Sequence, residues 1–258
     1  MGHSNLLEKP GRLMLAEKDQ QAYHWVQNNG RSYLQLPSLN HPGVFHLFGT
    51  RLLDDEALVH YKPIRLQQVH GTHVQPVPKA PLSALLNAIE GDALVTDVPN
   101  RFISVGTADC VPVLLVDPVK RVSAAIHAGW RGSVQNIVGK TVQKMVSLYG
   151  ARPENIFAGI GPSIQPCCFE VDADVVEAVE KQTAHSQAVL YQEIEKVASG
   201  KWQLDLITLN RLQLIDAGLP KTHVASAGLC TSCLPNLFYS FRRDKKKRGN
   251  MVSGIMLI

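Results

Sequence analysis

The motif His127-Ala-Gly-Trp-Arg-Gly132 lies between an apolar segment and a long amphipathic one, and it constrains the fold more than any other stretch. Residues 122–126 form a short, mostly apolar run, which predicts a strand buried on both faces. Residues 133–148 carry apolar side chains at three- and four-residue spacing, which predicts a helix, and Gly150 is its expected C-cap. The sequence therefore predicts a strand, a tight glycine turn and a helix start whose free N–H groups attract anions.

The same arrangement, an apolar run that ends in a metal-type ligand, occurs twice upstream. Residues 64–69 lead to His70, and residues 102–109 lead to Cys110. Together with His127 these residues supply two imidazoles and one thiol. Three such ligands leave the fourth tetrahedral position open, which is typical of a catalytic zinc. The sequence therefore predicts a metal site at three strand ends.

Other interpretations of these residues stay open. Each could be an ordinary core residue, and His73 is a competing ligand three residues from His70. Without a metal, Cys110 could act as a nucleophile with His127 or His70 as its base and Asp109 as the orienting group. Copper also suits such ligands. The chain has no His-x-His pair, however, which disfavours a multinuclear copper cluster.

Two carboxylates and four arginines are further candidates. Asp92 and Asp109 lie beside predicted turns and could act as general acid or base, or simply cap those turns. A guanidinium group can bind an anion through two parallel hydrogen bonds. The candidates for such binding are Arg51, Arg131, Arg242 and Arg243. The lysine run at residues 245–247 is more typical of a solvated loop.

The other cysteines form a second set, with Cys167 next to Cys168 and a Cys230-x-x-Cys233 pair. Four thiolates could hold a structural zinc, but adjacent cysteines are poorly spaced for one knuckle. We therefore favour buried free thiols, since free cysteine packs as a small apolar residue. The odd count of five cysteines and the lack of an export signal predict reduced thiols in the cytoplasm.

Composition allows one sizeable core in 258 residues, and we expect a single domain. The formal charge of +4 is modest, so no nucleic-acid partner is expected, and no apolar stretch is long enough to span a bilayer. Predicted strands outnumber predicted helices, which favours an α+β fold with stacked sheets. Further helices are expected at residues 82–89, from residue 172 and at 205–217, and further strands at 32–36, 44–51, 111–116, 156–160, 224–227, 237–241 and 251–258.

Six motifs, in order along the chain, resemble those of the YfiH/YlmD family, also called the multicopper polyphenol oxidase (laccase-like) or purine nucleoside phosphorylase family. The resemblance runs from about Val44 to the C-terminus. The motifs are Gln68-Val-His70-Gly, Gly91-Asp92-Ala-Leu-Val-Thr-Asp97, Thr107-Ala-Asp-Cys110-Val-Pro, His127-Ala-Gly-Trp-Arg-Gly132, Ile160-Gly-Pro-Ser-Ile-Gln-Pro-Cys167-Cys168 and Phe238-Tyr-Ser-Phe-Arg-Arg-Asp244.

The resemblance implies a single-domain, four-layer α/β/β/α sandwich with mixed β-sheets over residues 1–258, with residues 1–40 as an N-terminal extension packed on it. It also implies a zinc ion held by His70, Cys110 and His127. The implied activity is phosphorolysis of adenosine, inosine, guanosine and methylthioadenosine, with adenosine deamination at the same site.

Further expectations complete this interpretation. Asp92, Asp109 and Cys110 are expected in catalysis. Substrate binding is expected of Arg51, Gln68, Arg131 and Arg243. The partners would be a purine nucleoside and phosphate, in a monomer or weak homo-oligomer. Alternatives are a hydrolase that edits peptidoglycan (muropeptide) precursors, a copper-dependent polyphenol oxidase and a non-catalytic zinc-binding module. The family's glycine-rich turn after Asp244 is replaced here by Lys245-Lys246-Lys247.

Overall fold

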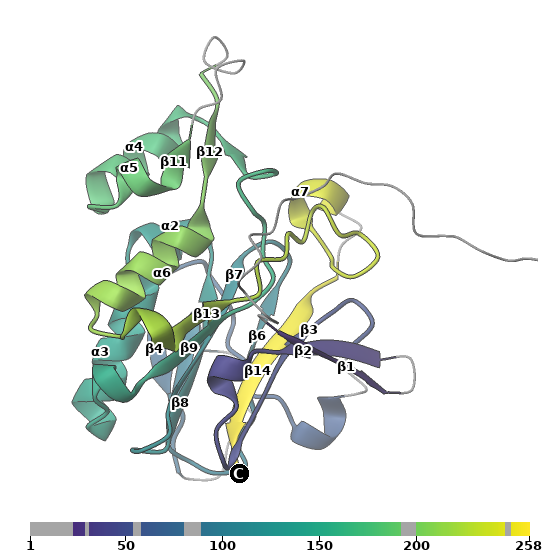
Figure 1. The fold of residues 1–258 in the computed structure, drawn as a ribbon, viewed down its shortest axis with the longest axis vertical. Coiled ribbons are helices and arrows are strands. Elements are labelled where there is room, and N and C mark those ends of the chain that lie inside the picture. The colour runs from purple at the N-terminus through teal and green to yellow at the C-terminus, as the bar shows by residue number, and fades with distance from the viewer. Residues whose placement is uncertain (1–22, 29–30, 54–57, 80–88, 192–199, 246–248) are drawn as a thin grey trace, which may run out of the picture.

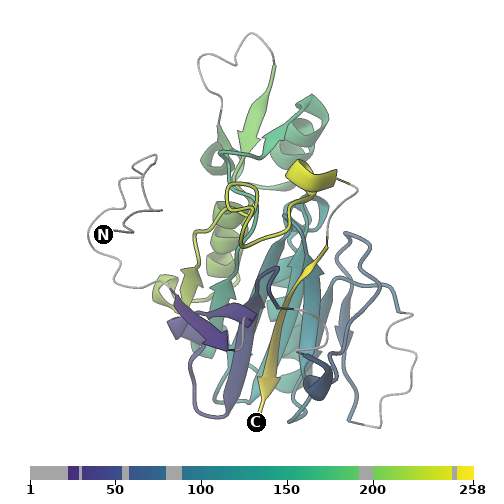
Figure 2. The same cartoon turned by 90° about the vertical axis from the view of Figure 1, so that its right-hand side faces the viewer.

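The structure, a computed structural model, describes residues 23–28, 31–53, 58–79, 89–191, 200–245 and 249–258 (Figures 1 and 2). The predicted helix at residues 82–89, apart from residue 89, and most of the lysine run fall outside these ranges. So do residues 1–22, over half of the predicted N-terminal extension.

The larger of two main sheets has six strands in the spatial order β13-β9-β7-β8-β5-β4. Central strands β7 and β8 pair antiparallel, whereas the outer pairs β4–β5 and β9–β13 are parallel. Both central strands are buried along their whole length, as predicted for continuous apolar runs. The bounds are β4 Val74–Pro76, β5 Ala93–Thr96, β7 Val111–Asp117, β8 Val122–Ala128, β9 Phe157–Ile160 and β13 Val224–Ser226.

The second main sheet has five antiparallel strands in the order β1-β2-β3-β14-β6. Its C-terminal strand, β14, lies between β3 and β6, so the end of the chain forms an inner strand of the sheet (Figure 1). The bounds are β1 His24–Asn28, β2 Arg31–Gln35, β3 Val44–Gly49, β6 Ile103–Thr107 and β14 Met251–Leu257.

Two hydrophobic cores hold the layers together. One lies between the two sheets, where β6 and β14 contact β8, and includes Ile103, Leu114 and Ile255. The other lies between the six-stranded sheet and helices α2 (Trp130–Val134), α3 (Ile137–Tyr149) and α6 (Leu206–Asp216) (Figure 1). The predicted α+β class with mixed sheets is confirmed. The fourth layer and the single-domain extent of residues 1–258 stay predictions.

A smaller region lies at the top of Figure 1, beyond the end of the main sheets. Its sheet has the order β10-β12-β11, formed by Glu170–Val171, Trp202–Leu204 and Leu190–Tyr191. Helices α4 (Ala173–Gln182) and α5 (Ser186–Val189) complete it. The remaining short helices are η1 Pro37–Leu39, η2 Val59–Tyr61, η4 Pro153–Asn155, η6 Lys221–His223 and α7 Phe241–Asp244.

The helix predicted for residues 133–148 is divided in two. Asn136 interrupts it with a left-handed backbone (φ 60°), a conformation that asparagine tolerates better than most residues. The Asn136 side chain then accepts a hydrogen bond from the N–H of Gly139 and caps the start of α3. The predicted end is confirmed, because Gly150 is the C-cap in a left-handed conformation. The break makes α2 a separate short helix directly after β8.

Two predicted strands are wrong. Residues 64–69 form only single bridges, one from Ile64 to Ile103 and one from Gln67 to Glu90. Ile103 lies in β6 of the five-stranded sheet, whereas Glu90 lies just before β5 of the six-stranded sheet. The segment therefore passes from one sheet toward the other instead of joining either. Residues 237–241 also form no strand, since Ser240 instead caps the short helix α7 by accepting a hydrogen bond from the N–H of Arg243.

Candidate active site and metal centre

Three separate segments bring His70, Cys110 and His127 together at one end of the two sheets. His70 follows the crossing segment, Cys110 lies between β6 and β7, and His127 lies near the end of β8. One ligand atom of each lies within 4.8 Å of the others. The two imidazole rings are 4.8 Å apart, centroid to centroid, and nearly perpendicular. The structure thus brings together the three residues predicted as metal ligands.

Gly129 makes this approach sterically feasible. A Cβ atom at this position would lie 2.8 Å from Cδ2 of His70 and 3.3 Å from Sγ of Cys110. The first distance is shorter than real Cβ atoms show, so any larger residue would displace the His70 ring. The glycine after β8 is therefore needed for the close approach of His70 and Cys110.

The buried carboxylate of Asp92 connects the two histidines. One of its oxygens, Oδ1, lies 2.8 Å from Nδ1 of His127 and accepts the N–H of His70 at 2.9 Å. The other accepts the N–H of Gly71 at 2.7 Å. His70 has a left-handed backbone (φ 59°), which is costly for a non-glycine residue and is stabilised here by these bonds. Asp92 therefore orients both ligands from behind. Its placement favours a positioning role over the expected role as catalytic acid or base.

The environment of the group favours the ionised thiol. Burial raises the pKa of Cys110, but hydrogen bonds from His127 and His70, and the charges of both rings, lower it to about 6. Burial lowers the pKa of His127, but its bonds to Asp92 and Cys110 raise it to about 9. A thiolate is the form of cysteine that binds metals, so the group is prepared for a cation.

The carboxylate of Asp109, the neighbour of Cys110, is hydrogen-bonded to residues between 231 and 242. Its Oδ1 accepts the hydroxyl of Thr231 at 2.6 Å, and its Oδ2 accepts the Ser240 hydroxyl at 3.0 Å and the N–H of Arg242 at 2.7 Å. Asp109 also has a positive φ of 90°. These contacts favour an anchoring role, in which Asp109 fixes the loop that closes one side of the site.

The ligand group lies in a pocket of about 830 Å³. Two kinds of side chain dominate its remaining wall. The aromatic side chains are those of Trp130, Phe169 and Phe241, and the cationic ones are those of Arg65, Arg131 and Arg242. The guanidinium of Arg131 lies over the Trp130 ring at 4.3 Å, and that of Arg242 lies 5.4 Å from the Phe169 ring. Such a pocket can stack a planar ring and bind an anion beside a metal.

Sequence and structure comparisons agree on the relationship. A profile of the family described as multi-copper polyphenol oxidoreductase laccase matches residues 50–258. The chain belongs to the YfiH/YlmD family. The predicted membership is thereby confirmed, and the match covers most of the chain.

Named relatives of this YfiH/YlmD protein are enzymes. Purine nucleoside phosphorylase YlmD of Bacillus subtilis (strain 168) is 41% identical over 164 residues, which cover 64% of this chain and 58% of that protein. The matched segment thus spans less than two thirds of that relative. Purine nucleoside phosphorylase of Bacteroides thetaiotaomicron is 39% identical over 197 residues, covering 74% and 71%. Adenosine deaminase RL5, from an unknown prokaryotic organism, is 40% identical over 169 residues, covering 65% and 63%.

Solved structures in the YfiH/YlmD family show the same fold. YfiH of Bacillus licheniformis superposes with a TM-score of 0.79 at 27% identity, covering 91% of this chain and 99% of that one. YlmD of Geobacillus stearothermophilus gives a TM-score of 0.78 at 27% identity, covering 90% and 98%. The relatives support an enzyme that acts on small molecules, and the family description and the ligand group point to a bound metal. None of the helices described in the structure is long and apolar enough to cross a membrane.

The structure separates the residues predicted to bind substrate in this YfiH/YlmD chain. Gln68 and Arg131 line the pocket. The Gln68 amide bonds in both directions to the backbone of Gly106, at 2.8 Å each, so it also ties the crossing segment to β6. The competing ligand His73 lies outside the ligand group, and its Nε2 lies 3.3 Å from Oε1 of Gln75.

Neither Arg51 nor Arg243 is among the described residues that line the pocket. Arg51 donates to the carbonyl oxygen of Pro235, and its guanidinium lies 4.9 Å from the Tyr239 ring centroid. Arg243 donates to three backbone carbonyl oxygens and to Asp244. Both guanidinium groups therefore support a loop, and their role in substrate binding stays a prediction.

Three pocket residues had no functional signal in the sequence: Arg65, Phe169 and Asn250. Arg65 shares the crossing segment with His70, so its position five residues upstream was the only hint. Phe169 directly follows the paired cysteines. Asn250 precedes β14, and nothing in the sequence marks it as facing a pocket.

Proposed function

We propose that the chain is a zinc-dependent purine nucleoside phosphorylase that also deaminates adenosine. One observation carries the proposal: Cys110 and His127 line the same pocket as Trp130, Phe169 and Arg131. A metal centre therefore lies beside aromatic rings and a guanidinium group, which suits a planar base together with an anionic co-substrate. Relatives named for both activities support the choice of reaction.

The ligand set suits zinc. His70, His127 and Cys110 offer two nitrogens and one sulfur, and zinc bonds of about 2.0–2.3 Å require such atoms to converge as these do. Three protein ligands leave one position for water or substrate, as in catalytic sites. A zinc ion bound there would supply a Lewis acid that polarises an oxygen atom. Copper accepts the same ligands, so the metal has to be measured.

The protein side chains have separate tasks in this proposal. The rings of Trp130, Phe169 and Phe241 offer faces for stacking a purine, an interaction worth roughly 1–3 kcal/mol per base. The fork of Arg131 matches two oxygens of a phosphate ion. Asp92 fixes the orientation of the His127 ring through Nδ1, which directs its other nitrogen toward the metal.

The reaction balances without a redox step. In phosphorolysis, a phosphate oxygen bonds to C1′ of the ribose while the C–N bond to the base breaks. The base nitrogen keeps the electron pair and takes up a proton, which gives free base and ribose 1-phosphate. In deamination, water replaces the amine on the ring carbon of adenosine and ammonia leaves. Binding phosphate and nucleoside together in one pocket lowers the entropic cost of the first reaction.

A product screen tests this proposal. Protein of known metal content is incubated with inosine, adenosine, guanosine or methylthioadenosine, with and without phosphate, and products are separated by liquid chromatography. We expect free base only when phosphate is present, and inosine as an additional product from adenosine. His70→Ala should abolish both activities, whereas the matched variant His73→Ala should retain them, because His73 lies outside the ligand group.

The alternatives predict different results in the same screen. Faster turnover of a muropeptide precursor than of any nucleoside would favour a cell-wall hydrolase. Oxygen uptake with a phenol, on copper-loaded protein, would favour the oxidase that the family description names. Bound zinc without turnover of any substrate would leave a zinc-binding module.

A further inference from the structure

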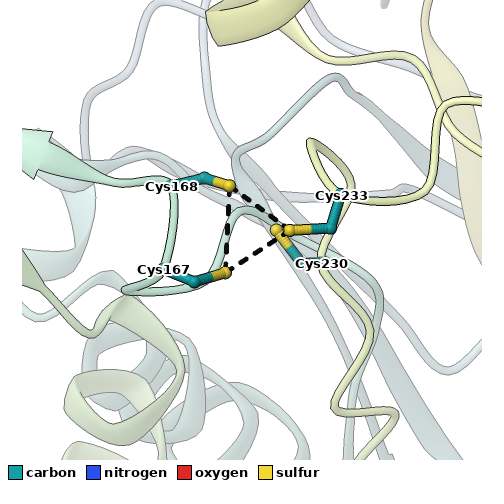
Figure 3. Close-up of side chains that lie close together, drawn as sticks. All are labelled: Cys167, Cys168, Cys230 and Cys233. Carbon is teal, nitrogen blue, oxygen red and sulfur yellow. Dashed lines mark hydrogen bonds between the residues drawn. The ribbon is translucent and has the colours of Figure 1, made fainter. Parts of the chain in front are cut away.

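Four of the five cysteines form a second cluster outside the pocket. Each offers a sulfur, and all four sulfur atoms lie within 4.8 Å of one another. Figure 3 shows that two come from the loop before β10 and two from the loop after β13, and that all four point toward a common centre. The cluster consists of Cys167, Cys168, Cys230 and Cys233.

The spacing of these sulfurs matches tetrahedral coordination. The Sγ atom of Cys233 lies 3.4 Å from that of Cys168 and 3.6 Å from that of Cys167, and the two adjacent cysteines are 3.8 Å apart. Four sulfurs about 2.3 Å from one zinc ion lie roughly 3.8 Å from each other. All four cysteines are free, so no two of them are joined in a disulfide. The distances therefore suit one shared ion better than a cross-link.

The backbone resolves the objection that adjacent cysteines cannot serve one site. The N–H groups of Cys168 and Phe169 both donate to the carbonyl oxygen of Gln165, at 2.9 Å, so the chain turns tightly at this point. This turn directs both adjacent sulfurs to the same side, as Figure 3 shows. The expectation that these thiols are buried is wrong for Cys167 and Cys233, whose side chains are exposed and accessible to an ion.

A positive charge lies beside the second loop. The guanidinium of Arg243 donates to the carbonyl oxygens of Thr231 and Ser232, the two residues between Cys230 and Cys233, at 2.9 Å each. It holds the Cys-x-x-Cys turn in shape.

We propose a second, structural zinc site whose ligands are the sulfurs of Cys167, Cys168, Cys230 and Cys233. Four thiolates fill the coordination of zinc and leave no position for a substrate, which is why the site is structural. It lies apart from the pocket, and it does not depend on the proposed nucleoside chemistry.

This zinc would fix one wall of the active site. Phe169, which lines the pocket, directly follows Cys168. Thr231, between the other two ligands, donates its hydroxyl to Asp109, which also accepts the N–H of Arg242. The first of the two loops that the ion joins therefore carries Phe169 into the pocket. The second bonds to Asp109, which also holds Arg242 in α7.

Metal analysis of a set of variants, purified with a reductant, tests the site. Wild-type protein should contain about two zinc ions per chain, one catalytic and one structural. Cys110→Ala and Cys233→Ser should each contain about one, and the double variant almost none. Asn236→Ser is the matched control, since Asn236 is an exposed residue of the same loop outside the cluster, and it should keep both ions.

Cobalt substitution gives an independent measurement that does not require Cys233→Ser to fold. Cys110→Ala loaded with Co²⁺ retains only the four-cysteine cluster, and it should show intense thiolate-to-cobalt charge-transfer bands. Absence of these bands would overturn the proposal. So would unchanged zinc in Cys233→Ser, stoichiometric iron or copper in the cluster, or an intact mass lower by two hydrogens that reveals a disulfide. Loss of zinc from Cys110→Ala tests only the metal site in the pocket. The proposals for the two zinc sites can therefore be contradicted independently.

Discussion

Nδ1 of His127 lies 2.8 Å from Oδ1 of Asp92, and the same carboxylate accepts the backbone N–H groups of His70 and Gly71. One buried side chain thus orients both histidines of the ligand group. Asp92 itself does not line the pocket among the described residues, so its contribution to catalysis is indirect.

Asp92→Asn should weaken zinc binding by roughly 10–100-fold, the usual cost of losing a partner of a metal-bound histidine. The asparagine side chain has one acceptor oxygen where the carboxylate has two. It therefore cannot accept the bonds from both the His127 ring and the loop at Gly71, and the His127 ring loses its fixed orientation. Competition with a chromogenic chelator measures the affinity. Asp117→Asn is the control, because Asp117 is equally buried but accepts only backbone N–H groups at the far end of β7. Equal zinc affinity in Asp92→Asn and wild type would contradict the positioning role.

Gly129→Ala should remove metal from the pocket while the fold is retained. The new methyl group would lie 2.8 Å from Cδ2 of His70, so the ring must move away. Gly106→Ala is the control, since its methyl group meets nothing closer than 3.6 Å. Zinc content and circular dichroism are measured on both proteins. A fully loaded pocket in Gly129→Ala would mean that the His70 ring is not held where the structure places it.

Arg131→Ala should raise the KM for phosphate more than the KM for inosine. Loss of a charge-assisted pair costs on the order of 1.5–3 kcal/mol, which corresponds to roughly a 10–100-fold weaker interaction. Steady-state rates with each substrate varied in turn give both constants. Arg51→Ala is the matched control, because Arg51 lies outside the pocket and contacts Pro235 and Tyr239. A larger effect of Arg51→Ala than of Arg131→Ala would reverse the assignment.

The sequence was sufficient for the ligand group but not for its surroundings. His70, Cys110 and His127 each follow or end an apolar run, and this pattern predicts that they converge. The prediction of a strand before His70 is nevertheless wrong. The bond from Asp92 to His127 depends on β5 pairing with β8, a long-range contact that no local pattern encodes. The convergence of the four other cysteines is not predicted for the same reason. Spacing along the chain does not show that the turn at Cys167 lies beside the turn at Cys230.

Local rules also failed where tertiary contacts dominated. Residues 64–69 have the composition of a strand, yet they cross between sheets through single bridges. Arg243 has the charge of an anion-binding residue, but its donors are used by backbone carbonyl oxygens. By contrast, α3 forms close to its predicted place, because its apolar periodicity agrees with the face that it buries. Helix α6 and strand β14 also form close to their predicted places.

His46 should make the protein less stable in mild acid. Its ring is fully buried in β3, and Nε2 accepts the N–H of Leu36 at 3.0 Å, which requires the neutral form. Burial lowers its pKa from 6.5 to about 4. Between pH 6.5 and about pH 4, His46 is protonated in the unfolded chain but neutral in the folded chain. The stabilising contribution is therefore present above pH 6.5 and is lost as the pH falls to about 4.

That difference in pKa corresponds to roughly 3 kcal/mol across this range. Urea unfolding at several pH values measures it. His46→Gln keeps an acceptor for Leu36 but does not titrate. On acidification over this range, the variant should therefore lose about 3 kcal/mol less unfolding free energy than the wild type does. Parallel pH profiles for the two proteins would show that the pKa of His46 is the same in the folded and unfolded chains, which would contradict the prediction.

The central claim is that phosphate is a co-substrate in the metal-containing pocket. Phosphorus NMR on inosine, phosphate and zinc-loaded protein tests it most directly, with hypoxanthine quantified on the same samples. We predict that ribose 1-phosphate appears and inorganic phosphate disappears in equal amounts, matching the hypoxanthine released, and that Cys110→Ala gives none of these changes. Hypoxanthine released with an unchanged phosphate signal, or the same products from Cys110→Ala, would contradict the account.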